Sequence, residues 1–193
     1  MNLDSNSWNL RYIQDNTGWD VGEITTPLKD YFDQLGNKDI RILIPGCGNS
    51  YEAEYLFNNG FRNVYVLDFS RKALDNFIRR TNNFPANNIL HEDFFNLVGD
   101  YDLIIEQTFF CAIDVKRRLE YARKAHSLLN VGGKLVGLLF NAPMYEDHPP
   151  YGGSVKEYNN YFSSLFELNI FEPAYNSILS RNGKELFINF QRK

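Results

Sequence analysis

The sequence predicts an α/β protein with a mostly parallel, twisted sheet that is covered by helices on both faces. Short apolar runs alternate with amphipathic segments along most of the chain, an order that is typical of strands joined by helical crossovers. The apolar runs lack a strict alternation of polar and apolar side chains, as expected for strands that are buried on both faces. A glycine-rich turn follows the first of these runs, at the kind of position where open α/β sheets bind ligands.

Seven segments are predicted to form the strands of this sheet. Each is a short apolar run, rich in β-branched or aromatic side chains, that lies next to turn-forming residues. The turn signal Asn182-Gly183 precedes the last of them and predicts one antiparallel strand near the C-terminus. The predicted strands are residues 40–44, 64–67, 88–90, 103–105, 134–140, 166–171 and 185–191.

Helices are predicted from apolar side chains that recur three and four residues apart. The stripe from Leu28 to Leu35 follows Pro27 and stops at Gly36, which are typical residues at the two ends of a helix. Residues 130–133 are predicted to be a turn. No linker divides the chain, so residues 1–193 are predicted to form one domain, with residues 1–38 as a helical cap. The other predicted helices are residues 51–58, 71–81, 154–164 and a long helix that ends near Leu129.

The bulk composition excludes several classes of function. The net charge is −4 and no long basic cluster occurs, which disfavours a nucleic-acid partner. Cys47 and Cys111 show neither a disulfide framework nor a metal-ligand spacing, so no metal is expected. The chain has no signal-peptide pattern and no apolar stretch of about 18 residues, so no membrane segment is expected. We therefore expect a cytoplasmic protein, most simply a monomer.

The turn after the first predicted strand contains Gly46, Cys47 and Gly48. Two glycines let the backbone turn tightly and approach a ligand closely. The third glycine of a dinucleotide fingerprint would fall at Tyr51, which argues against a nicotinamide cofactor. By itself, this turn fits an ordinary structural role as well as a ligand site.

Acidic and aromatic residues follow the second and third predicted strands. Asp68, followed by Phe69, stands where a carboxylate can accept both hydroxyls of a ribose. Its alternative role is to cap the next helix, although Ser70 is better placed for that. Asp93 could accept the exocyclic amine of an adenine while Phe94 covers a ring face. The alternative is that the aromatic side chain belongs to the core.

Longer motifs occur along the chain from Trp8 to Lys193, in addition to the residues at these strand ends. They resemble those of class I S-adenosylmethionine methyltransferases and, within that class, the thiopurine S-methyltransferase family, above all its plant halide and thiol methyltransferases. The motifs are Trp8-(x3)-Tyr12-(x6)-Trp19-Asp20-Val21-Gly22-Glu23-Ile24-Thr25-Thr26-Pro27, Pro45-Gly46-Cys47-Gly48, Glu92-Asp93-Phe94-Phe95, Tyr101-Asp102-Leu103-Ile104, Phe110-Cys111-Ala112-Ile113 and Asp147-His148-Pro149-Pro150-Tyr151.

The resemblance implies a Rossmann-like class I methyltransferase fold, S-adenosylmethionine as methyl donor and S-adenosylhomocysteine as product. Trp8 and Trp19 would belong to a lid over the cofactor, and Asp68 would hold its ribose. Gln107 departs from the family, because thiopurine-type members have a basic residue there, and this argues against a thiopurine-like acceptor. The residues predicted to bind the cofactor are Trp8, Trp19, Gly46, Cys47, Gly48, Asp68, Phe69, Asp93, Phe94, Glu106 and Gln107.

The expected reaction is methyl transfer to a small thiol, sulfide or halide ion. These nucleophiles need no strong general base, which fits a sequence without an evident catalytic dyad, and the catalytic residues stay unassigned. His148 and Tyr151 are the candidates for the acceptor pocket. The Pro-Pro-Tyr sequence beside them resembles a motif of amino-methylating enzymes, but it follows the fifth strand instead of the fourth. Arg118, which matches a family arginine, is expected to form a surface or structural salt bridge.

Three alternatives stay open at this stage. The chain could bind S-adenosylmethionine without turnover, it could methylate another small molecule, or it could be a nicotinamide-dependent oxidoreductase on a similar sheet. Calorimetry with each cofactor and detection of methylated products separate these possibilities.

Overall fold

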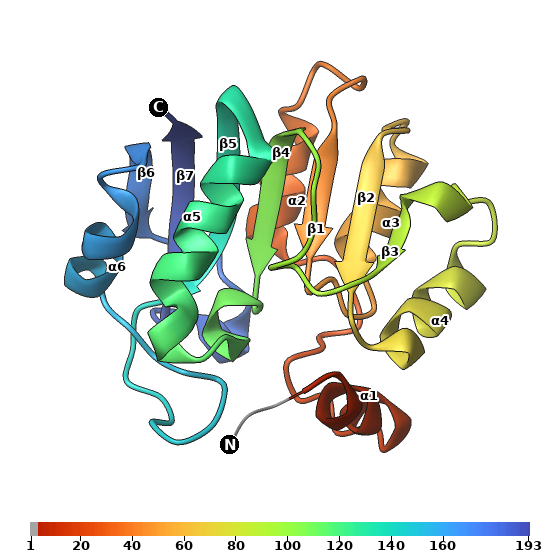
Figure 1. The fold of residues 1–193 in the computed structure, drawn as a ribbon, viewed down its shortest axis with the longest axis horizontal. Coiled ribbons are helices and arrows are strands. Elements are labelled where there is room, and N and C mark those ends of the chain that lie inside the picture. Colours follow the sequence, from red (N-terminus) through yellow and green to blue (C-terminus); the bar gives the residue numbers. More distant parts are fainter. Residues whose placement is uncertain (1–3) are drawn as a thin grey trace. The chain divides into compact units, whose positions relative to one another are not determined.

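The computed structural model describes residues 4–193 (Figure 1). These residues divide between Leu97 and Val98 into two units. The predicted cap, residues 1–38, therefore begins outside the described residues. The first unit contains α1 (Ser5–Ile13), α2 (Thr26–Asp33), β1 (Ile42–Pro45), α3 (Tyr51–Asn58), β2 (Val64–Asp68), α4 (Arg71–Arg80) and β3 (Ile89–His91). The second contains β4 (Tyr101–Gln107), α5 (Arg118–Leu128), β5 (Leu129–Phe140), α6 (Val155–Phe162), β6 (Phe166–Pro173) and β7 (Glu185–Arg192).

In the first unit, β1 and β3 flank β2, and both pair with it in parallel. All four residues of β1 are buried, which explains why this strand is an apolar run without alternation. The helices α3 and α4 both pack on β2. The carboxyl ends of the three parallel strands therefore lie at one edge of this part of the sheet, where Asp68 and His91 are register partners.

In the second unit, β4 and β5 are parallel, and β7 is antiparallel to both β5 and β6. This arrangement confirms the prediction of one antiparallel strand near the C-terminus. The helix α5 packs on β5, and Figure 1 shows it running along that strand. Most side chains of β6 are exposed or half-buried, so β6 is less covered than the other long strands.

Aromatic side chains fill the core of the second unit. Phe110 lies 5.0 Å from Tyr121 and 5.5 Å from Tyr158, measured between ring centroids, and most of these contacts are edge-to-face. Phe162 extends the cluster to Phe190 at 5.2 Å. Ring pairs of this kind contribute about 0.5–1.5 kcal/mol beyond the area that they bury. Much of the aromatic content of the chain therefore serves packing.

The structure confirms the predicted strands and helices to within a few residues, with one error. The prediction of a turn at residues 130–133 is wrong, because β5 begins at Leu129 and continues through them to Phe140. Gly132 has a φ of 78°, and a Cβ atom at Gly133 would lie 2.8 Å from the carbonyl oxygen of Asn130. Glycine is needed here to bend a continuous strand, and not to end one.

Candidate functional site

The glycine turn after β1 is held in place by the end of β2. Gly46 and Gly48 have φ values of 58° and 53°, in the left-handed region that favours glycine. The Cys47 amide donates to the carbonyl of Leu67 at 3.0 Å, and the Gly48 amide donates to Oδ2 of Asp68 at 2.9 Å. The two strand ends predicted to meet a ligand are thus joined to each other.

Asp68 is buried and organises this strand end. Its Oδ1 accepts a hydrogen bond from the Ser70 amide at 2.7 Å, while Oδ2 accepts the one from Gly48. Burial raises the pKa of the carboxyl, and these backbone donors oppose that shift. Each carboxylate oxygen can accept a further donor, so both can still receive a hydroxyl. Ser70 caps α4 by accepting from the Ala73 amide at 3.2 Å, as predicted.

Three aromatic rings from the N-terminal segment form a cluster, and one of them, that of Tyr12, contacts the glycine turn. Trp19 contacts Trp8 at 5.3 Å and Tyr12 at 5.8 Å between centroids, and its Nε1 donates to the Tyr12 hydroxyl at 3.3 Å. Tyr12 is only 5% exposed, and a Cβ atom at Gly48 would lie 2.5 Å from its hydroxyl oxygen. Tyr12 therefore packs directly against the turn. The sequence contained Tyr12 in its N-terminal motif, but no role was predicted for it.

Polar contacts add to this packing. The carboxylate of Asp20 accepts from the amide of Gly22 at 2.8 Å and from the side chain of Asn49, the residue after Gly48. Asn76 of α4 donates to the side-chain oxygen of Asn49 at 3.0 Å. The segment between α1 and α2 is therefore bonded to the residue that follows the glycine turn, and through it to α4.

The third strand end differs from its prediction in detail. Phe94 is 1% exposed and belongs to the core, whereas the ring of Phe95 is half-buried and lies 5.4 Å from it. Asp93 accepts from the Phe95 amide at 2.9 Å. Phe69 is half-buried, and its carbonyl accepts from Nε2 of His91 at 3.2 Å. Phe95 is thus the ring of the Phe-Phe pair that retains surface outside the core.

In the second unit, Glu106 is fully buried near the end of β4. Its Oε1 accepts from the amides of Phe109 and Phe110 at 2.9 and 2.8 Å, and its Oε2 accepts from the Tyr121 hydroxyl at 2.6 Å. The carboxylate thereby holds the turn that follows β4. Burial raises the pKa of Glu106 to about 7, although the three donors oppose the shift. Gln107, the last residue of β4, is half-buried.

Glu106 should make stability depend on pH. Its pKa rises from 4.5 to about 7 on folding, so the folded state binds a proton more tightly than the unfolded state. The resulting stabilisation is present below pH 4.5 and is lost as the pH rises to 7, by on the order of 3 kcal/mol. In Glu106→Gln this loss should be absent, because the amide does not titrate: its oxygen can accept from the Phe109 and Phe110 amides, and its nitrogen can donate to the Tyr121 hydroxyl oxygen. Urea unfolding of the wild type and of Glu106→Gln across this pH range measures the loss. The prediction would be contradicted if the free energy of unfolding changed equally with pH in both proteins.

A small hollow opens beside the turn after β4. Thr108, with a φ of 57°, redirects the chain there, and the Cys111 thiol donates to its carbonyl at 3.3 Å. His148 and Tyr151 do not line this hollow. The half-exposed His148 ring lies 4.1 Å from that of Tyr145, and Tyr151 is buried, with its amide donating to the Cys111 carbonyl at 2.7 Å. The lining residues are Thr108, Phe110, Cys111, Leu138, Leu139, Phe140 and Glu185.

Within residues 4–193, no group of three or more His, Cys, Asp or Glu side chains is arranged to hold a metal ion. In the same range, every helix is too short or too polar to cross a membrane.

Comparison of the sequence with known protein families identifies the kind of protein that contains these sites. The family model described as thiopurine S-methyltransferase matches residues 3–191, almost the entire chain. The chain belongs to this family. It is an S-adenosylmethionine-dependent methyltransferase, as predicted, and the nicotinamide alternative is thereby excluded.

Individual relatives agree with this assignment. A probable thiol methyltransferase 2 from Arabidopsis thaliana is 31% identical over 159 residues, 80% of this chain and 70% of the relative. Thiocyanate methyltransferase 1 from Brassica oleracea is 28% identical over 189 residues, 95% of this chain and 83% of the relative.

A solved structure confirms the predicted fold class. The 1,6-didemethyltoxoflavin-N1-methyltransferase from Burkholderia thailandensis, with bound 1,6-didemethyltoxoflavin and S-adenosylhomocysteine, matches with a TM-score of 0.79 at 12% identity. The match covers 98% of this methyltransferase and 87% of the other chain. This likeness establishes the Rossmann-like methyltransferase fold.

Proposed function

We propose that this methyltransferase transfers a methyl group from S-adenosylmethionine to a small, polarisable nucleophile, either a thiol or sulfide or a halide ion. The names of two relatives, a probable thiol methyltransferase and a thiocyanate methyltransferase, support an acceptor of this class. The net charge of −4 supports a small molecule or ion as acceptor rather than nucleic acid.

One arrangement in the first unit carries the proposal. The carboxylate of Asp68 accepts a hydrogen bond from the Gly48 amide and so fixes the left-handed turn, which Tyr12 covers. The residues fit the cofactor in kind, because Gly46 and Gly48 add no side chains to the turn and Asp68 offers acceptor oxygens beside it, while Tyr12 covers the turn at Gly48. In this proposal the turn holds the methionine part and Asp68 accepts the ribose hydroxyls. Trp8 and Trp19 cover the cofactor as parts of the lid.

The adenine end of the proposed site lies at the third strand end. Asp93 would accept the exocyclic amine, as predicted from the sequence. Phe69 and Phe95 are half-buried and have surface to offer to a ring, while Phe94 supports Phe95 from the core. The assignments of Phe94, Glu106 and Gln107 as cofactor contacts stay predictions.

When bound, the cofactor supplies a methyl group that is already activated by a positively charged sulfur. The task of the chain is then to orient the reactants and exclude water, which can contribute up to about 7–11 kcal/mol in well-aligned reactions. The rings of Trp8 and Trp19 already meet a cation of the chain itself, the Arg11 guanidinium, at 5.3 and 5.8 Å from their centroids. A halide is already ionised, and a thiol is a few per cent ionised near neutral pH, so neither requires a strong base.

The location of the acceptor pocket stays a prediction, because the small hollow at the end of β4 and β5 is a feature of the second unit alone. The hollow combines aromatic and aliphatic side chains with the hydroxyl of Thr108, the thiol of Cys111 and the carboxyl group of Glu185. His148 and Tyr151, the acceptor-pocket candidates of the sequence, stand in the neighbouring loop. Tyr151 is bonded to the wall of the hollow through the Cys111 carbonyl.

Detection of volatile or soluble methylated products tests the proposal. The protein is incubated with S-adenosylmethionine and, in turn, iodide, bisulfide and aryl thiols, with headspace or mass detection of the methylated acceptor. At least one acceptor should give product in an enzyme-dependent manner. If calorimetry shows S-adenosylhomocysteine binding but no acceptor is methylated, the alternative of binding without turnover is supported instead.

A further inference from the structure

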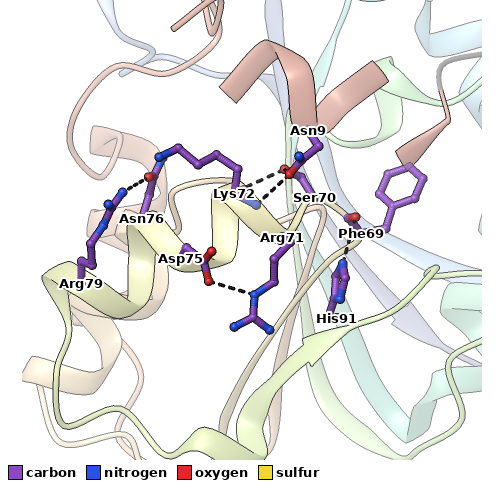
Figure 2. A network of polar contacts seen from close by, with 10 residues as sticks. Asn9, Phe69, Ser70, Arg71, Lys72, Asp75, Asn76, Arg79 and His91 are labelled. Atoms are coloured by element: carbon purple, nitrogen blue, oxygen red, sulfur yellow. Dashed lines mark hydrogen bonds and ion pairs between the residues drawn. The ribbon is translucent and has the colours of Figure 1, made fainter. Parts of the chain in front are cut away.

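The helix α1 is bonded to the start of α4 through one side chain, that of Asn9 (Figure 2). Its Oδ1 accepts from the Lys72 amide at 2.8 Å and from the Ser70 hydroxyl at 3.2 Å. These partners are more than 60 residues away in the sequence. Lys72 lies in the first turn of α4, where backbone amides have no partner within the helix. Asn9 thus supplies an acceptor that α4 itself lacks.

The same contact connects α1 to the proposed ribose carboxylate. The Gly48 amide donates to Asp68, the Ser70 amide donates to Asp68, and the Ser70 hydroxyl donates to Asn9. Asp68 and Ser70 are both buried, so water competes poorly for these bonds. A continuous path of hydrogen bonds therefore runs from the glycine turn through the end of β2 to α1.

Two aromatic residues of the N-terminal cluster, Trp8 and Tyr12, lie on the helix that Asn9 holds. Trp8 precedes Asn9 directly, and Tyr12 is three residues further along α1, packed against Gly48. Leu10 and Ile13 of the same helix are exposed, so the apolar contact of α1 depends on few side chains. A short helix with so little buried apolar surface needs specific polar contacts to stay in one position.

We propose that Asn9 is a positioning residue for methyl transfer, which keeps α1 closed over the glycine turn and so retains the cofactor. This inference rests on the proposed cofactor site. It assigns to Asn9 no contact with the cofactor or the acceptor. The carboxamide acts through α1, and the structural requirement at this position is a side-chain oxygen that accepts two donors.

The test compares three variants of the full-length protein. Asn9→Ala removes the acceptor oxygen. Asn9→Asp keeps an acceptor oxygen, and its carboxylate faces the positive N-terminal end of α4. Asn6→Ala is the control, because it makes the same truncation at an exposed position of the same helix. Hydrogen exchange of the α1 amides is measured without ligand, and the dissociation rate of S-adenosylhomocysteine is measured by stopped-flow tryptophan fluorescence.

In Asn9→Ala, the α1 amides should exchange faster, and S-adenosylhomocysteine should dissociate faster, each by at least about fivefold, as expected for the loss of hydrogen bonds. The KM for S-adenosylmethionine should rise more than kcat falls. Asn9→Asp should stay within about threefold of the wild type, since its carboxylate oxygen accepts the same donors. Asn6→Ala should not differ from the wild type.

Unchanged exchange and dissociation in Asn9→Ala would overturn the inference, and so would failure of Asn9→Asp to restore them. These outcomes are separate from failure of the proposed function. If the wild type itself bound no S-adenosylhomocysteine, the cofactor site would be wrong, while the effect of Asn9 on exchange in α1 would still be measurable without ligand.

Discussion

Replacing Arg118 by methionine is expected to lower the free energy of unfolding by about 1.5–3 kcal/mol, the usual contribution of hydrogen bonds that involve a charged group. The Arg118 side chain is 1% exposed and donates to Glu157 at 2.8 Å and to the Tyr151 carbonyl at 3.2 Å. Its guanidinium also lies 4.8 Å from the centroid of the Phe110 ring. Methionine fills part of the volume but leaves both acceptors without this donor.

Urea unfolding measures this effect, with Arg117→Met as the matched control. Arg117 pairs with Glu120, but its side chain is 44% exposed, so its loss should cost less than about 1 kcal/mol. If the Arg118 and Arg117 variants unfolded at the same urea concentration, the buried pair would not contribute as described. The sequence prediction of a surface or structural salt bridge is thus resolved in favour of a buried, structural one.

Replacing Asp68 by asparagine is expected to weaken the binding of S-adenosylhomocysteine by about 1.5–3 kcal/mol, or roughly 10- to 150-fold. An amide has a single acceptor oxygen, so it cannot accept from both Gly48 and Ser70 and still receive two ribose hydroxyls. The turn after β1 and the ribose contact should therefore be impaired together.

Calorimetry of S-adenosylhomocysteine binding measures the loss, with Asp75→Asn as control. Asp75 lies in α4, and its side chain is 45% exposed. Its carboxylate pairs with Arg71 at 2.9 Å. Its removal should leave the affinity unchanged within about twofold, because exposed pairs contribute little. An Asp68→Asn variant with wild-type affinity would show that Asp68 does not hold the ribose.

The sequence predicted the order of the elements because local patterns encode it. Apolar runs, helix stripes and helix caps such as Ser70 depend on neighbours within a few residues, and these predictions are confirmed. The one wrong element, the turn at residues 130–133, contained two adjacent glycines. In this fold the glycines allow a long strand to bend, a choice that depends on the neighbouring strand and not on the local sequence.

The details of the candidate site could be predicted only in part. The strand-end positions of Gly48 and Asp68 follow from the topology of parallel strands, so they were accessible from the sequence. The contact of Tyr12 with Gly48 and the bonds from Asn9 to α4 join segments far apart in the chain, which no local pattern reveals. Glu106 did carry a signal, since an acid inside an otherwise buried strand indicates internal hydrogen bonds.

A crystal structure of the protein with S-adenosylhomocysteine tests the central claim most directly. We expect both ribose hydroxyls to donate to Asp68 and the homocysteine part to follow the backbone from Gly46 to Gly48, with Tyr12 and Trp19 closed over it. A ligand bound away from this turn, or a ribose without contact to Asp68, would contradict the account.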